Sequence, residues 1–319
     1  MKKGNLVISL DFELLWGVFD KVDPSDKEEY FNNTRQVIPE ILKLFENYKT
    51  AGTWATVGML FNENLADWKA NQPKDLPQYD NQGLSPYHFM GQQNKKLPEK
   101  MLFAKDLIQK INGTARQEMA THTYSHYYCL ENGQNIDQFK ADLKQAISLA
   151  QRMNVNLKSL VFPRNQFNPD YLKACFELGI KTVRSNPSQW YWQDTTSTAL
   201  KNKLFRTGDA YFGKNNKSYR LEQISRNSGE LLCQPASRFL RPISGQAFLN
   251  NLRLKRIKSE MTTAAKKGEV YHLWWHPHNF GDFPEKSLED LSVILKHFDV
   301  LREKYDFSSK SMSEIAEGI

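Results

Sequence analysis

The run His122-Thr123-Tyr124-Ser125-His126 carries the most specific chemistry in this sequence. Its two histidines are four residues apart, a spacing that puts both side chains on one face of a helix or of a strand. Two imidazoles on one face are a common way to bind zinc or a similar divalent ion. Because such pairs also arise by chance, the spacing alone is a moderately specific signal for a metal site.

A pair of carboxylates follows the first apolar run of the chain. Asp11 and Glu13 come directly after residues 5–10 and are two positions apart, so an extended backbone points both side chains to one face. Such a pair suits metal binding combined with general-base catalysis. A solvated strand end with a helix cap is the alternative interpretation.

Two further clusters stand at the ends of apolar runs. Arg164 can orient a carboxylate through a bidentate pair, although an isolated arginine beside a turn is more often a surface residue. In the segment 271–279, His276 and His278 are two positions apart and can share a face. The reference pKa of histidine lies near neutrality, which suits acid–base catalysis. We interpret His272 as a satisfied core histidine.

Short apolar runs alternate with helical patterns along the chain, as in α/β folds. The predicted strands are residues 5–10, 53–58, 116–120, 158–162, 180–183 and 269–275. The predicted helices are roughly residues 31–50, 98–112, 136–152, 168–178, 245–267 and 285–304. Repeated strand–helix units favour a (β/α) barrel or a wound sheet, in which the carboxyl ends of the strands carry the chemistry. The clusters described above all follow predicted strands.

Three polar stretches lack clear periodicity, namely residues 62–97, 186–203 and 207–220. We expect them to be loops or small insertions over the mouth of the barrel. No internal repeat or domain linker is visible in the sequence. Residues 1–319 are therefore predicted to form a single α/β domain with insertions at about 62–97 and 186–220.

Composition narrows the class of protein. The net charge is +7 and the pI about 9.1, but the basic residues are scattered, so a basic surface is favoured over nucleic-acid binding. Three widely spaced cysteines without a CxxC pair fit a reducing compartment better than a disulfide framework. The apolar run after Lys3 is too short for a signal peptide, and no run reaches about 18 apolar residues. We expect a cytoplasmic protein without an integral membrane segment; its oligomeric state stays open.

The order of the motifs resembles the polysaccharide deacetylase (NodB-homology) family. An acidic strand end, the HTYSH run, a strand-end Arg and a C-terminal strand-end His follow one another as in that family. Residues 118–126 are similar to the family's second motif almost residue for residue, and residues 51–58 resemble a family strand that ends in Gly. The resemblance spans about residues 4–279. It implies a distorted (β/α) barrel with a divalent metal, commonly zinc, at its mouth.

The resemblance also implies roles for single residues. His122 and His126 match the family's metal ligands, and Arg164 matches the strand-end arginine that orients the catalytic base. His276 matches the histidine of the final motif, the general acid, and His278 is the alternative for that role.

The first motif departs from the family pattern. The family has two adjacent aspartates, of which the first is the general base and the second is the third metal ligand. Here Asp11 matches the first, Phe12 stands at the second position, and Glu13 follows. Either Asp11 is the base and Glu13 the ligand, which we favour, or Asp11 binds the metal and another group acts as the base.

The implied activity is metal-dependent removal of N-acetyl groups from amino sugars of a polysaccharide or of a sugar precursor. Trp190, Trp275 and His278 are expected to contact this carbohydrate substrate. One alternative keeps the site and changes the substrate, to a deformylase or amidase reaction on a lipid-linked sugar or a small amide. Another alternative is a non-catalytic carbohydrate-binding protein on the same scaffold, a hypothesis supported by Phe12.

Overall fold

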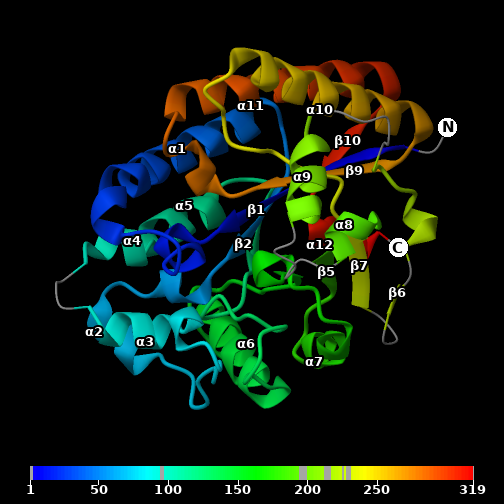
Figure 1. The fold of residues 1–319 in the computed structure, drawn as a ribbon. Coiled ribbons are helices and arrows are strands. Elements are labelled where there is room, and N and C mark those ends of the chain that lie inside the picture. The colour runs from blue at the N-terminus through cyan, green and yellow to red at the C-terminus, as the bar shows by residue number, and fades with distance from the viewer. Residues whose placement is uncertain are drawn as a thin grey trace.

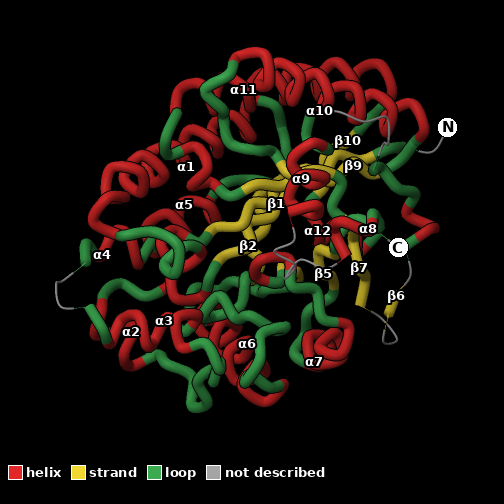
Figure 2. The backbone as a smooth tube through the Cα atoms, viewed as in Figure 1, coloured by secondary structure: helices red, strands yellow, loops and turns green. Residues whose placement is uncertain are grey.

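A curled, mostly parallel β-sheet surrounded by helices forms the centre of the molecule (Figure 1 and Figure 2). The computed structural model describes residues 3–93, 97–193, 200–211, 217–224, 226–227 and 231–318. Among these residues, eight parallel strands are hydrogen-bonded in the order β7-β5-β4-β3-β2-β1-β9-β8. A short antiparallel strand, β6, extends the β7 edge, and β10 pairs with β1.

The strands are β1 (Asn5–Phe12), β2 (Gly52–Thr56), β3 (Gln117–Thr121), β4 (Ser159–Val161), β5 (Thr182–Ser185), β6 (Arg226–Asn227), β7 (Leu231–Pro235), β8 (Arg238–Phe239), β9 (Val270–Trp275) and β10 (Ser308–Lys310). The helices are α1 (Glu28–Asn47), α2 (Leu65–Ala70), α3 (Pro86–Gly91), α4 (Glu99–Leu102), α5 (Lys105–Gly113), α6 (Ile136–Gln151), α7 (Leu172–Glu177), α8 (Trp190–Gln193), α9 (Leu200–Gly208), α10 (Ala247–Lys267), α11 (Pro284–Tyr305) and α12 (Met312–Glu317).

One extended segment joins the two ends of the sheet. Residues 231–239 pair with β5 through β7 and then with β9 through β8. Backbone hydrogen bonds continue this second pairing, since Ser237 N donates to His272 O and Leu240 N donates to Trp274 O. The sheet therefore curls into the distorted (β/α) barrel that the sequence predicts.

Side chains of the barrel strands alternate between two environments. In β1, Leu6, Ile8, Leu10 and Phe12 belong to the large apolar cluster that also contains the buried faces of α1, α5, α6, α10 and α11. The intervening residues face the barrel interior, where Val7 is apolar but Ser9 and Asp11 are polar. This period of two places the polar residues of the strands together inside the barrel.

The chain's last elements close one end of the barrel. Met312 and Ile315 of α12 pack on interior residues such as Val7 and Val270. Met312 N donates a hydrogen bond of 2.9 Å to Thr53 Oγ1, at the amino end of β2. The carboxyl ends of the strands, at the opposite end, are left for the site.

Most predicted elements are confirmed. All six predicted strands and all six predicted helical regions are present with shifted ends, and the helix predicted over 98–112 is divided into α4 and α5. The short strands β6, β7, β8 and β10 were not predicted. The insertion at 62–97 contains α2 and α3, and the insertion at 186–220 contains α8 and α9; residues 94–96, 194–199 and 212–216 lie outside the described residues.

No helix within the described ranges is both long enough and apolar enough to span a bilayer.

Candidate active site

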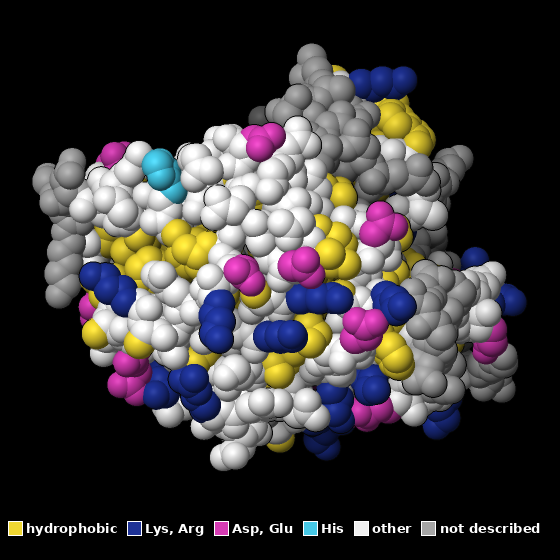
Figure 3. Space-filling model, turned by 90° about the horizontal axis from the view of Figure 1, so that it is seen from below, with side chains coloured by type: hydrophobic (Ala, Val, Ile, Leu, Met, Phe, Trp, Pro, Cys, Tyr) yellow, Lys and Arg dark blue, Asp and Glu magenta, His cyan; other side chains and the backbone are white. Residues whose placement is uncertain are grey.

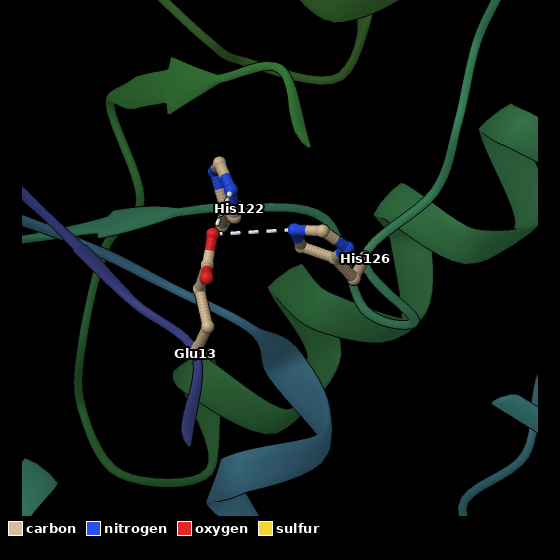
Figure 4. A group of neighbouring side chains, drawn as sticks. All are labelled: Glu13, His122 and His126. Atoms are coloured by element: carbon tan, nitrogen blue, oxygen red, sulfur yellow. Dashed lines mark hydrogen bonds and ion pairs between the residues drawn. The ribbon is translucent and has the colours of Figure 1, made fainter. Parts of the chain in front are cut away.

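Glu13 lies between the two histidines of the HTYSH run (Figure 4). Its Oε1 atom is 3.1 Å from His122 Nε2 and 3.2 Å from His126 Nε2. All three side chains are buried. Burial alone would raise the pKa of Glu13, but the neighbouring histidines, His276 foremost, hold it well below its usual range. Glu13 is therefore an ionised carboxylate facing two imidazole nitrogens.

The backbone after β1 makes room for this carboxylate. Glu13 precedes a 3₁₀ turn, Leu14–Gly17, in which Leu14 has a positive φ of 48°. A Cβ atom at Gly17 would lie 1.8 Å from Glu13 Oε2. Only glycine therefore fits at this position while Glu13 keeps its orientation.

The loop that carries the two histidines is held by α6. Asp142 of this helix accepts hydrogen bonds from Tyr124 N at 2.7 Å and from Ser125 N at 3.0 Å, and the Ser125 hydroxyl donates to it as well. Thr123 and His126 have φ values of 63° and 57°, a left-handed conformation that is costly for such residues. The contacts of Asp142 stabilise this unusual backbone and so fix the spacing of the histidines.

Tyr128 contacts the second nitrogen of His126. Its hydroxyl oxygen lies 3.1 Å from His126 Nδ1, and the two rings meet edge to face. Burial lowers the pKa of His126 to about 4, so this imidazole is neutral near pH 7. A neutral imidazole with one nitrogen oriented by a hydrogen bond is the form that binds metal ions.

Asp11 is paired with Arg184, an arginine outside the set of predicted site residues. Both carboxylate oxygens accept hydrogen bonds of 2.7 Å from Arg184 of β5. The same guanidinium donates to Ser9 Oγ at 3.0 Å and to Asn165 Oδ1 at 3.0 Å, and it stacks 4.2 Å from the ring centroid of Trp274. Arg184 and Asp11 are both almost fully buried, so the orientation of the Asp11 carboxylate is fixed.

The structure corrects the role expected for Arg164. Its guanidinium donates to Asp20 and lies 4.3 Å from the ring centroid of Tyr128, not beside Asp11. Arg164 follows β4 in a 3₁₀ turn with a positive φ of 53°, which directs the side chain toward Asp20. Arg184 makes the bidentate carboxylate contact that was expected of Arg164.

The two C-terminal histidines also reach the site. His276 Nε2 is 3.7 Å from Asp11 Oδ2 and 3.6 Å from Glu13 Oε1, and its side chain is 23% exposed. His278 is stacked on His276 and places Nδ1 3.8 Å from Glu13 Oε2. Burial lowers the pKa of His278 to about 3. His276 is thus the histidine accessible to a ligand, and His278 is a neutral imidazole behind it.

The aromatic residues proposed to bind substrate lie outside this cluster. Trp275 is fully buried against Phe45 and Phe280 on the outer face of β9, so the structure corrects the expectation that it contacts a ligand. The neighbouring Trp274 faces inward and contacts the His276 ring at 5.7 Å. Trp190 is half exposed on α8 and packs on Phe205, with no contact to the histidines or carboxylates described above.

The residues present fit a divalent metal ion. In a tetrahedral zinc site with ligand atoms about 2.0–2.1 Å from the ion, neighbouring ligand atoms are about 3.3 Å apart. The Nε2–Oε1 distances of 3.1 and 3.2 Å come close to this value. Glu13, His122 and His126 therefore form a group able to hold a metal, and Asp11, Glu13 and His276 form a second, overlapping group.

Three residues of the site were missed in the sequence, and two of them carry a detectable signal. Arg184 follows the predicted strand 180–183 directly and alternates with the inward-facing Thr182. Asp142 is a charged residue on the buried face of a predicted helix, between Phe139 and Ala146. Tyr128 carries no such signal, because the direction of its hydroxyl depends on the shape of the loop after His126.

The fold is similar to that of solved polysaccharide deacetylases. A protein of Mycobacterium smegmatis assigned to this class has a TM-score of 0.62 at 14% identity, covering 100% of this chain and 90% of that chain. One from Pseudomonas aeruginosa PAO1 has a TM-score of 0.59 at 11% identity, with 98% and 89% covered. The Puue allantoinase has a TM-score of 0.57 at 12% identity, with 98% and 88% covered.

No family model and no curated protein sequence matches the chain. At these identities the similarity establishes the fold, a deacetylase-type (β/α) barrel, and leaves the activity to be argued from the site.

Proposed function

We propose that this protein is a divalent-metal-dependent hydrolase that removes N-acetyl groups from amino sugars of a polysaccharide or of a sugar precursor. The observation that carries the proposal is the position of Glu13 Oε1, within 3.2 Å of Nε2 of both His122 and His126. Position 12, where the family has a metal-binding aspartate, is Phe12 in this chain. A glutamate side chain is one methylene longer than an aspartate, and this length allows the carboxylate of Glu13 to reach the histidines from the next position. Asp11, meanwhile, stays with Arg184, so the two carboxylates take separate roles.

His122, His126 and Glu13 would hold the metal. When bound, zinc or another divalent ion supplies a Lewis acid for the amide carbonyl and lowers the pKa of water from about 15.7 toward 7. The chain contributes a preformed set of ligands. Tyr128 orients His126, the contacts of Asp142 fix the loop, and Gly17 leaves space for the Glu13 carboxylate.

Asp11 is the proposed general base. Arg184 donates one hydrogen bond to each carboxylate oxygen, and each oxygen keeps a further lone pair. The bidentate contact holds the carboxylate plane next to Glu13, where Asp11 accepts a proton from the attacking water. Without the contact to Arg184, the Asp11 carboxylate could rotate, and the rate of proton transfer to it would fall.

His276 is the proposed general acid. It is the most exposed of the histidines around Glu13, and its Nε2 lies within 3.7 Å of both carboxylates. His278 is less suited, because its pKa of about 3 leaves it without an added proton at neutral pH. Protonation of the leaving nitrogen by His276 allows the C–N bond to break, which gives acetate and a free amine.

A second candidate is the hydrolysis of another amide, in a formylated sugar or a small molecule. The specific observation in its favour is the similarity to allantoinase over 98% of the chain, which shows that this fold is not confined to proteins assigned as deacetylases.

The proposal is tested by measuring bound metal and activity together. Elemental analysis of the purified protein, followed by acetate and formate release from a panel of N-acetylated and N-formylated amino sugars and small amides, tests both candidates. We expect His122→Ala and His126→Ala to lose the metal and at least about 100-fold in activity. The exposed His88 provides a matched control, since His88→Ala should change neither quantity.

Each possible result has a clear meaning. Full activity of His122→Ala without bound metal would overturn the proposal. Release of formate alone, or hydrolysis of small amides alone, would support the second candidate. Sugar binding by a wild-type protein that takes up no divalent metal would instead support a non-catalytic carbohydrate-binding protein.

A further inference from the structure

A chain of buried polar side chains lies in the barrel interior beneath the site. On the face turned to the viewer in Figure 3, basic and acidic side chains are interspersed at the surface. Inside the barrel, by contrast, Ser9, His272 and Arg184 are each at most 3% exposed, and Ser9 contacts both of the others. Burial of polar groups costs free energy unless they are hydrogen-bonded, so this buried chain calls for a specific explanation.

Arg184 reaches across the barrel to the Asp11 carboxylate. It stands on β5, and the strands β4, β3 and β2 separate β5 from β1 in the sheet. Every hydrogen on its two terminal nitrogens has an acceptor, since two point to Asp11, one to Ser9 Oγ and one to Asn165 Oδ1. Its Nε has no acceptor among the described residues. The end of this long side chain is therefore held by one carboxylate and by two neutral oxygens.

Ser9 is in turn oriented by His272. Its hydroxyl oxygen accepts the hydrogen bond from Arg184, and its single hydrogen is left for His272 Nε2, at 2.9 Å. Burial holds the pKa of His272 well below its usual range, so the imidazole is neutral and Nε2 can accept. β9 lies next to β1, with His272 opposite Val7. On the other side, His272 N donates to Ser237 Oγ and Ser237 N donates to His272 O, so the imidazole is fixed relative to Ser9.

Stability alone does not explain an imidazole at this position. His272 Nδ1 is buried and has no hydrogen-bond partner in the part of the chain that the structure describes. Because Nε2 accepts from Ser9, Nδ1 carries the ring hydrogen, and an unsatisfied buried donor destabilises the fold. An apolar side chain of similar size would avoid this cost. What the histidine adds is an acceptor for the Ser9 hydroxyl, which keeps the Ser9 oxygen turned to Arg184.

We propose that Ser9 and His272 are positioning residues that act through Arg184 to fix the carboxylate of Asp11. His272 takes the Ser9 hydrogen, and Ser9 presents its oxygen to one terminal nitrogen of Arg184. Arg184 then keeps both terminal nitrogens on the Asp11 oxygens. The inference rests on the proposed function, in which Asp11 accepts a proton from water. Because both residues act on the base and not on the substrate, their loss should lower kcat more than it changes KM.

Ser9→Ala tests the link to Arg184. The substitution removes the acceptor of one terminal hydrogen of Arg184, and we expect kcat to fall about tenfold with KM within about twofold of the wild type. Ser159→Ala is the matched control, because Ser159 is also fully buried on a barrel strand but donates to Glu118, at the amino end of β3. It should keep the wild-type kcat. Circular dichroism melts verify that each variant is folded.

Two substitutions of His272 separate its hydrogen bond from its bulk. Leucine fills a similar space without an acceptor, whereas the side-chain carbonyl of glutamine can accept the Ser9 hydrogen. We expect kcat to fall about fivefold in His272→Leu and to stay within about twofold of the wild type in His272→Gln. Equal kcat values in the two variants would overturn the role of His272.

Rotation of the Arg184 guanidinium provides a readout that needs no substrate. Nuclear magnetic resonance of the full-length protein with labelled arginine measures exchange of the two terminal nitrogens about the Nε–Cζ bond, and Arg184→Lys identifies the signal by its absence. We expect this exchange to be at least about fivefold faster in Ser9→Ala, because one hydrogen bond that restrains the guanidinium is lost. Ser159→Ala should match the wild type.

The outcomes separate the inference from the proposed function. Unchanged kcat in Ser9→Ala, or unchanged rotation of Arg184 in that variant, would overturn the inference while amide hydrolysis by the wild type stands. A wild-type protein that hydrolyses no amide of the substrate panel would overturn the proposed function. Faster rotation of Arg184 in Ser9→Ala would in that case still support the contact through which Ser9 holds Arg184.

Discussion

Asp11 and Glu13 leave the same strand two residues apart and yet have different partners. Arg184 takes both oxygens of Asp11, while one oxygen of Glu13 faces two imidazole nitrogens. Neither carboxylate could exchange places with the other, because the Asp11 side chain is tied to β5 and the shorter aspartate at position 13 would fall short of the histidines. At the residue scale, the site thus separates a metal-binding carboxylate from an oriented, arginine-bound one.

A pair of arginine substitutions tests this separation. Arg184→Lys retains the charge but loses the planar fork that grips both oxygens of Asp11, so we expect kcat/KM to fall by about 100-fold. Arg164→Lys should change it by less than about threefold, because Arg164 contacts Asp20. Steady-state kinetics on the best substrate of the panel, with the melting temperature of each variant, provide the comparison. The opposite ranking would restore Arg164 as the orienting residue.

Tyr128 should act through His126. Tyr128→Phe removes the hydroxyl that lies 3.1 Å from His126 Nδ1, and loss of such a contact typically costs about 10- to 100-fold in metal affinity. Metal affinity is measured by competition with a chromogenic chelator. Tyr219→Phe is the matched control, since the buried Tyr219 hydroxyl has no hydrogen-bond partner among the residues that the structure describes. An unchanged affinity in Tyr128→Phe would show that this contact does not tune the ligand.

At the scale of elements, the site depends on how two short connections are shaped. The turn after β1 directs Glu13 inward, and the loop after β3 holds His122 and His126 in a conformation stabilised by Asp142 from α6. The connection after β1 is a single 3₁₀ turn, and the loop after β3 belongs to no helix or strand. Close contacts with neighbouring elements therefore help to fix both connections.

Gly17→Ala tests the first connection. The new methyl group would occupy the position of the Glu13 carboxylate, so the carboxylate must turn away from the histidines. We expect at least about tenfold weaker metal binding and a loss of about 1–3 kcal/mol in the free energy of unfolding. Isothermal titration with zinc and chemical denaturation measure the two effects. Gly113→Ala is the control, because a Cβ atom there meets nothing within 4 Å. Wild-type zinc affinity in Gly17→Ala would contradict this account.

The regular elements could be predicted because their patterns are long or strongly apolar. The helix observed at Ile136–Gln151 was predicted at 136–152, and the strand observed at Val270–Trp275 was predicted at 269–275. The segment 231–239 escaped prediction, since its two strands are short, include Pro235 and change partners midway. A change of partner is a property of the whole sheet and leaves no local pattern.

The site was predictable to a similar degree. The residues grouped by the structure include Asp11, Glu13, His122, His126 and His276, all selected from strand ends. Trp275 was misplaced because the alternation along β9 was not applied: His272, Trp274 and His276 share the inward face, so Trp275 must face outward. Arg164 and Arg184 both follow predicted strands. Which of them contacts Asp11 depends on how far each strand lies from β1 in space, and the spacing of residues along the chain does not give that distance.

On the scale of the whole molecule, the barrel interior contains a polar chain below the site. His272 Nε2 lies 2.9 Å from Ser9 Oγ, which accepts a hydrogen bond from Arg184, the partner of Asp11. Burial, assisted by the nearby Arg184, holds the pKa of His272 well below its usual range. The folded protein therefore keeps His272 neutral at pH values where the unfolded chain protonates it.

This difference predicts acid sensitivity. Below about pH 6.5 the unfolded state binds a proton at His272 that the folded state does not, so the free energy of unfolding decreases as the pH falls. Above that pH, His272 is neutral in both states and does not make the free energy of unfolding depend on pH. We expect His272→Gln to lose less stability than the wild type between pH 7 and pH 5, in urea titrations with EDTA present. His88→Gln, a change at an exposed position, should leave the pH dependence of the free energy of unfolding as in the wild type. The same pH dependence in His272→Gln and in the wild type would refute His272 as the source of the acid sensitivity.

The pairing of β10 with β1 has a consequence for the order of assembly. Asn5–Val7 finds its neighbour in Ser308–Lys310, about 300 residues further along the chain. A growing polypeptide emerges from the ribosome at roughly 5–20 residues per second, so the strand that leads to Asp11 and Glu13 waits on the order of 15–60 seconds for this partner. Until then one edge of its amino-terminal half is open. Synthesis speed and early chaperone binding therefore bear directly on whether the carboxylates of this site reach their places.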